Sequence, residues 1–233
     1  MYKRQKEGVL NEKLALKKLL TYMKSVYKIP QKIKCLTDER KRKSIPLFNI
    51  VMPVLLFLML QYESFHTIFS DPESMSKRLK NCISGRIPKV DAVRDLLSRI
   101  NPDEIRSIHE EMIDIIKRNR VFREGTIGGY VVAGLDGVEL FSSTKKSCPN
   151  CLSRKKHTGE TEYFYRSVVC MIIGKSPHVI LGQEMLKPRD GSGKDEGELT
   201  GGKRLIEQLK KRHGHFADVI VADALYLNAP FIN

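Results

Sequence analysis

The sequence predicts an α + α/β protein: a helical, basic N-terminal region (1–124) is followed by an incomplete, mixed β-sheet domain (125–233). Three observations support this fold class. Apolar residues recur at helical spacing up to about residue 122, and short β-branched runs bounded by glycine replace them after Gly125. Most of the net charge of +14 lies in the first 44 residues.

The first 44 residues predict one amphipathic helix that ends at Pro30. Its apolar positions are Leu10, Leu14, Leu16, Leu20 and Met23. Two interpretations of its lysines and arginines stay open. They form an arm that contacts nucleic-acid phosphates, or they are the solvated face of an ordinary helix.

An uncharged stretch, IPLFNIVMPVLLFLML (45–60), follows this basic segment. It is shorter than the roughly 20 residues that a membrane span needs, and Pro53 interrupts it. We therefore predict a buried core helix, with a membrane or interfacial segment as the alternative.

Further helices are expected on either side of the turn RIPKV (86–90). A polar and aromatic continuation covers 62–76, with a helix start at Asp71-Pro72. Asp91 is a candidate N-cap for a helix over 92–100. Asn101-Pro102 opens another helix, because proline suits the first helical position; its apolar stripe is Ile105, Ile108, Met112, Ile115 and Ile116.

The second region alternates short apolar runs with polar turns. Strands are expected at 130–135 and 138–141, joined by a tight turn at Asp136-Gly137. Further strands are expected at 163–173 and 178–182. A polar loop (187–202), a helix (205–212) and a last buried strand (219–222) complete the order.

Asp136 and Asp223 are the candidate catalytic residues, because each is expected to end a buried strand. The order β-β-β-α-β is that of an RNase H-like sheet, whose first and fourth strands lie side by side. Phosphodiester cleavage and strand transfer use two divalent ions about 4 Å apart, and Mg²⁺ prefers carboxylate oxygens. The two aspartates would hold Mg²⁺ or Mn²⁺. The structural alternative is that each aspartate simply starts a turn.

The stretch from Gly129 to Asn233 resembles the IS4-like superfamily of insertion-sequence transposases. The resemblance is carried by VAGLDGVELFSS, by CPNCLSR with YFYRSVV, by KDEGELTGGKRLIEQL and by VIVADALYLNAPF. It implies an RNase H-like catalytic domain of the DDE type, in which Asp136 and Asp223 are the first two acids. It also implies magnesium-dependent DNA cleavage and strand transfer at the ends of the element, without a covalent enzyme intermediate.

The sequence departs from the family pattern at the third acid, a glutamate within Y-x2-R-x3-E-x6-K. No glutamate follows Asp223. Tyr163 and Arg166 have the first part of that spacing, but Cys170 occupies the glutamate position. We therefore expect a C-terminally truncated domain that holds metal weakly and lacks transposition activity as it stands. The alternative is a DNA-binding transposase remnant without catalysis.

A basic segment around CPNC is the predicted DNA contact. Its members are Lys145, Lys146, Arg154, Lys155 and Lys156. Cys148 and Cys151 have the C-x2-C spacing of zinc ligands, and His157 with Cys170 or His178 would complete such a site. One alternative is a DNA-facing basic loop without metal. The other is a loop that neither binds zinc nor contacts DNA.

An acidic run precedes the helix at 205–212. Its members are Glu184, Asp190, Asp195, Glu196 and Glu198. A solvated loop is expected, with Thr200 or Glu198 near the helix N-terminus, where negative charge is favoured. One metal ligand within the run is the alternative.

The composition narrows the class of protein. Lysine and arginine number 41 against 27 acidic residues, which favours a polyanionic partner. Five scattered cysteines do not form a secreted disulfide framework, so a cytoplasmic protein is expected. DNA is the expected partner and a homodimer a candidate assembly, with no membrane. A membrane-surface protein and an RNase H-like nuclease acting on another nucleic acid are competing interpretations.

Overall fold

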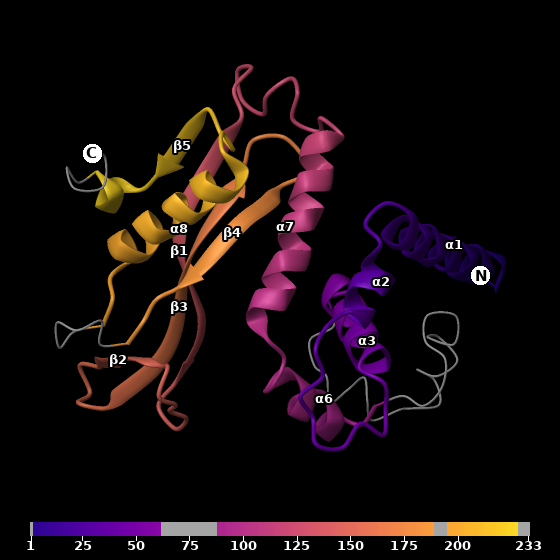
Figure 1. Cartoon of the computed structure of the whole chain (residues 1–233), viewed down its shortest axis with the longest axis horizontal. Helices are drawn as coiled ribbons and strands as arrows, with labels where there is room; N and C mark the ends of the chain where they lie inside the picture. The colour runs from indigo at the N-terminus through magenta and orange to yellow at the C-terminus, as the bar shows by residue number, and fades with distance from the viewer. Residues whose placement is uncertain (1, 62–87, 189–194, 228–233) are drawn as a thin grey trace. The chain divides into compact units, whose positions relative to one another are not determined.

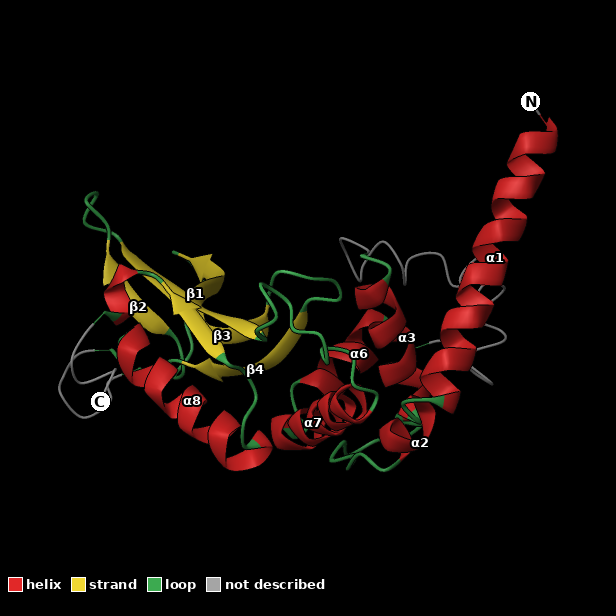
Figure 2. Cartoon of the chain, turned by 90° about the horizontal axis from the view of Figure 1, so that it is seen from above, coloured by secondary structure: helices red, strands yellow, loops and turns green. Residues whose placement is uncertain are grey.

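The chain has an α+β fold with helices and a mixed, open β-sheet (Figures 1 and 2). A computed structural model describes residues 2–61, 88–188 and 195–227. The chain divides into two compact units, Met1–Ile115 and Ile116–Asn233. The division falls within a helix, nine residues before the boundary expected from the change in sequence pattern.

The first unit begins with α1 (Tyr2–Ser25) and α2 (Ile29–Lys34). The expected single helix was wrong at its end, because α1 stops at Ser25. Lys28 adopts a left-handed conformation (φ 56°) and separates the two helices. Pro30 lies in the first turn of α2, where its missing N–H costs no hydrogen bond.

The apolar stretch forms a buried core helix, α3 (Phe48–Met59), as predicted. The helix runs through Pro53, its sixth residue, which lacks the N–H that would otherwise bond the carbonyl of Asn49. Among the described residues, no helix combines the length and apolar character that crossing a bilayer requires.

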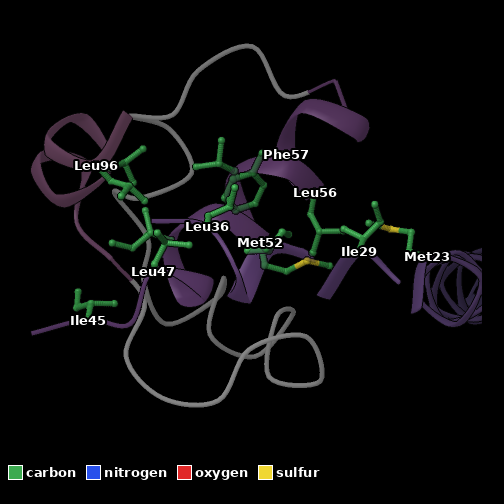
Figure 3. Close-up of a cluster of buried hydrophobic side chains, with 13 residues drawn as sticks. Met23, Ile29, Leu36, Ile45, Leu47, Met52, Leu56, Phe57 and Leu96 are labelled. Carbon is green, nitrogen blue, oxygen red and sulfur yellow. The ribbon is translucent and has the colours of Figure 1, made fainter. Parts of the chain in front are cut away.

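The core of the first unit is one cluster of buried apolar side chains (Figure 3). Ile50, Leu56 and Phe57 of α3 lie at its centre, each at most 2% exposed. Met23 of α1, Ile29 of α2 and segments before and after α3 pack around them. The apolar residues from which the sequence predicted a core helix are therefore buried in the core.

Two more helices complete the described part of this unit: α6 (Val90–Leu97) and α7 (Pro102–Arg118). Asp91 was wrong as the N-cap, since α6 begins one residue before it and Lys89 occupies the cap. The start of α7 at Pro102 is confirmed, and the side chain of Asn101 accepts the N–H of Asp103 at 2.9 Å. The expected helix at 62–76 lies outside the described residues.

Among the described residues, the sheet of the second unit has five strands. They are β1 (Val132–Ser143), β2 (Leu152–Lys155), β3 (Thr161–Ile172), β4 (Val179–Met185) and β5 (Val219–Ala222). The strand order is β2-β3-β1-β5, with β4 also paired to β3. Only the pairing of β1 with β5 is parallel.

Two expectations about these strands were wrong. β1 is one strand rather than a hairpin, because its pairing with β3 continues through Asp136↔Val169 and Gly137↔Val168. β5 was expected to be buried, but all four of its residues are exposed. It is an edge strand with β1 as its neighbour in the sheet.

Helix α8 (Glu198–His213) packs against β3 and β4 on one face of the sheet (Figure 2). It starts seven residues before the predicted helix. Gly182 of β4 admits Leu205 and Leu209, since a Cβ there would lie 3.2 Å and 3.1 Å from their methyl carbons. The crossover from β4 through α8 to β5 returns the chain beside β1.

Candidate active site

Asp136 and Asp223 lie at equivalent places on neighbouring strands. The parallel pairing of β1 and β5 runs from Val132↔Val219 to Leu135↔Ala222. Asp136 and Asp223 are the next residue on each strand, and both are exposed. Asp136 does not end its strand as expected, because β1 continues against β3; it marks the point where β5 leaves the sheet. The structure thus brings the two predicted residues together.

Each aspartate is oriented by one backbone N–H. The Oδ1 atom of Asp136 accepts the N–H of Gly137 at 2.7 Å. The Oδ1 atom of Asp223 accepts the N–H of Leu225 at 3.0 Å and caps a short 3-10 helix, η1 (Ala224–Tyr226). A carboxylate has about four lone-pair sites, so one N–H leaves room for a cation.

A buried tyrosine lies among three carboxylates at this edge. Burial, then the charges of Glu198, Asp223 and Asp136, and a hydrogen bond with Glu198 raise the pKa of Tyr226 well above its usual range. The hydroxyl therefore stays protonated beside these carboxylates. Tyr226 thus connects η1, which Asp223 caps, to the start of α8.

Glu198 lies at the start of α8, where the sequence predicted Glu198 or Thr200, but its contacts with the sheet were not predicted. It begins α8, and its Oε1 atom pairs with Arg166 of β3 at 2.8 Å. Its carboxylate also lies over β1, because a Cβ at Gly137 would be 2.3 Å from its Cδ atom. The helix-start pattern placed Glu198 on α8, but only the packing of α8 places it beside Asp136-Gly137.

The other members of the acidic run do not form a solvated loop. Arg204 of α8 binds both Glu184 and Glu196, and the Glu196 side chain is 2% exposed. Asp195 accepts the N–H of Ser153 at 2.7 Å. The expectation failed because the half-buried Arg204 supplies a counter-charge. Asp190 lies outside the described residues.

The described ranges contain no group of three or more His, Cys, Asp or Glu side chains that could hold a metal ion. Mg²⁺ does not require one, since proteins commonly hold it through one or two carboxylates together with phosphate oxygens and water. The Asp136–Asp223 pair fits that minimal arrangement.

Cys148 and Cys151 lie together in the connection between β1 and β2. Their Sγ atoms are 2.8 Å apart, and Cys148 Sγ is 2.6 Å from the hydroxyl of Tyr165. Hydrogen bonds from Cys151 and Tyr165 lower the pKa of the Cys148 thiol. Cys170 is separate from this pair: it is buried in β3, and burial raises its pKa to about 12. His157 and His178 do not join a group of three ligands.

Ion pairs divide the predicted basic segment into residues that are bound to the sheet and residues that are exposed to solvent. Arg154 binds Glu139 and Glu162, and Lys156 also binds Glu162. The guanidinium of Arg154 lies over the ring of Phe164 at 4.5 Å. These contacts hold Arg154 and Lys156 to the sheet. Lys145, Lys146 and Lys155 are exposed and are the members best placed to meet a polyanion.

Comparisons with protein-family models, with curated proteins and with solved structures found no match to the chain.

Proposed function

We propose that the chain is a DNA transposase of the DDE type, acting by Mg²⁺- or Mn²⁺-dependent cleavage and transfer of DNA strands at insertion-sequence ends. One observation carries the proposal. The parallel pairing of β1 and β5 stops immediately before Asp136 and Asp223, the residues that the IS4-like motifs identify as the first two acids. Two segments far apart in the sequence thus supply carboxylates to one edge.

The sheet topology supports an RNase H-like assignment of this domain. β1 lies between β3, which is antiparallel to it, and β5, which is parallel. A helix precedes β5 and packs on β3 and β4. A parallel neighbour needs such a crossover, and this crossover brings Asp223 to Asp136.

The roles of the residues follow from their positions. Asp136 and Asp223 would hold the cation, which when bound stabilises charge on the attacking and leaving oxygens. Lys145, Lys146 and Lys155 would contact phosphates and position the strand. Glu198 is held by Arg166, so its role in this account is to fix α8 over β1. With two aspartate ligands, we expect slow cleavage.

The test is strand nicking of supercoiled DNA by the full chain with Mg²⁺ or Mn²⁺. Asp136→Asn and Asp223→Asn should each reduce the nicking rate by about 100-fold or more, because a neutral amide holds the cation poorly. Glu207→Gln removes an exposed carboxylate elsewhere on α8 and should leave the rate unchanged. Equal nicking by wild type and both asparagine variants would overturn the proposal.

A non-catalytic DNA-binding protein is the second candidate function. It is favoured by the net charge of +14. DNA binding without nicking, equally tight in wild type, Asp136→Asn and Asp223→Asn, would support it. The affinity should then fall steeply with salt.

A further inference from the structure

Helix α8 packs on one face of the sheet, and part of β1 faces the other way (Figure 2). A Cβ at Gly137 would meet the carboxylate of Glu198, which begins α8. Successive side chains of a strand point to opposite faces of the sheet. The two neighbours of Gly137, Asp136 and Val138, therefore lie on the face opposite α8.

The strand register extends this opposite face toward β2. Residues that pair directly across antiparallel strands share a face. The pairs on the face of Asp136 are Asp136↔Val169, Val138↔Ser167, Phe141↔Tyr165 and Ser143↔Tyr163. Phe141 keeps this face despite its odd spacing, because the register shift after Glu139 leaves one extra residue on β1. The pair Lys155↔Thr161 adds Lys155 of β2. We call Val138, Phe141, Tyr163, Tyr165 and Lys155 the aromatic face, which ends at Asp136.

The aromatic face presents rings to solvent. Phe141 is 43% exposed and Val138 is 40% exposed, whereas Tyr163 and Tyr165 are half-buried. The ring centroids of Phe141 and Tyr165 are 6.4 Å apart. The hydroxyl of Tyr165 is 2.6 Å from the Sγ atom of Cys148, which fixes the ring. A flat ligand would therefore meet a preformed surface, which lowers the entropy that binding costs.

Positive charge borders the aromatic face. Lys155 belongs to the face itself, and Lys145 and Lys146 lie in the turn after β1; all three are exposed. The hydroxyl oxygen of Ser143 accepts the N–H groups of Lys145 and Lys146, each at 3.1 Å, which holds this turn to the end of β1. Aromatic rings beside lysines are the combination by which proteins bind unpaired bases and their phosphates.

We propose that the aromatic face binds single-stranded DNA and leads it to Asp136; the inference names the form of DNA at the candidate active site and rests on the function proposed above. Bases stack on Phe141 and the two tyrosines, and phosphates contact the lysines. In a duplex each base is already stacked between its neighbours, so only unpaired bases can stack on these rings. The strand from Asp136 to Ser143 is about 20 Å long at about 3.3 Å per residue, which suits about six nucleotides at a spacing of about 3.4 Å.

The experiment measures binding to the full chain by fluorescence anisotropy, with a chelator present so that no strand is cleaved. The labelled probe is an oligothymidine of about 12 nucleotides, within the site sizes of such surfaces. A duplex and an RNA strand of the same length are compared with it. We expect the single DNA strand to bind at least about tenfold more tightly than the duplex, because stacking adds to the phosphate contacts.

Variants test the rings and the lysines separately. Phe141→Ala, and Phe141→Leu, which keeps an apolar side chain but removes the ring, should each weaken single-strand binding by about tenfold. Lys145→Gln with Lys146→Gln should lower the slope of log affinity against log salt by about 1.4, since each phosphate contact on a single strand contributes about 0.7.

Matched controls lie elsewhere in the second unit. Tyr130→Ala removes a ring that is 60% exposed and precedes β1. Lys210→Gln with Lys211→Gln removes two exposed charges from α8, on the other side of the sheet. Both controls should bind the single strand as the wild type does, and circular dichroism should show the same fold in every variant.

The nicking assay on the same preparations separates this inference from the proposed function. Single-strand binding by a chain that nicks no DNA supports the aromatic face and removes the proposed function. Equal affinity for duplex and single strand, tighter binding of the RNA, no binding of the single strand, or wild-type affinity in both Phe141 variants would each overturn the inference, whether or not the chain nicks DNA.

Discussion

Replacing Arg204 with methionine is expected to lower the free energy of unfolding of the second unit by about 3–5 kcal/mol. Arg204 binds Glu184 at 2.8 Å and both oxygens of Glu196, and it donates to the carbonyl of Met185 at 3.0 Å. The Glu184 and Glu196 side chains are 12% and 2% exposed. Without Arg204 these carboxylates would remain buried and uncompensated. Urea unfolding followed by circular dichroism measures the loss.

The pH dependence of stability gives a second readout specific to this ion pair. Burial alone would raise the pKa of Glu196, but hydrogen bonds from Arg204 and from the N–H of Lys187 lower it below the ordinary 4.5. Wild-type stability should therefore fall as pH drops below about 4.5, because the unfolded chain binds the proton more tightly. In Arg204→Met this loss at low pH should become smaller, because burial then opposes only the hydrogen bond from the N–H of Lys187.

Two controls make the Arg204 result decisive. Lys210→Met removes an exposed cation from the same helix and should change the unfolding free energy by less than about 0.5 kcal/mol. Adding Glu196→Gln to Arg204→Met should recover part of the loss. A loss below about 1 kcal/mol for Arg204→Met would contradict the described network.

Replacing Phe57 with alanine is expected to destabilise the first unit by about 3–5 kcal/mol. Phe57 is 2% exposed and belongs to the central cluster of that unit, so truncation removes a large buried area and leaves a cavity. The adjacent Leu58 is 62% exposed, and Leu58→Ala should cost less than about 0.5 kcal/mol. Urea unfolding of both variants tests this contrast, and equal losses would show that α3 does not bury the face described.

Helical periodicity and apolar runs predicted most elements, because a face that packs into the core needs apolar residues at the spacing of the helix or strand. The core role of α3, the start of α7 at Pro102 and the strand content of β3 and β4 follow from this. Turn signals were less reliable. Asp-Gly predicts a hairpin, but pairing with β3 holds Asp136-Gly137 in an extended strand.

The candidate site was predicted in part. Asp136 and Asp223 stand next to each other where the parallel pairing ends, although Asp136 is inside its strand. The position of Glu198 could not be predicted, because it depends on Arg166 of β3 and on the packing of α8 over Gly137. Likewise, the acidic run was predicted to be solvated. The sequence does not show that the guanidinium of Arg204, eight residues beyond Glu196, binds the Glu196 carboxylate.

The central claim is that Asp136 and Asp223 share one divalent cation, and Mn²⁺ binding followed by electron paramagnetic resonance tests it most directly. The account predicts about one Mn²⁺ per chain, competed by Mg²⁺, with binding weakened in both Asp136→Asn and Asp223→Asn and retained in Glu207→Gln. If Mn²⁺ binding is absent from the wild type, or survives in either asparagine variant, the two aspartates do not form a shared metal site.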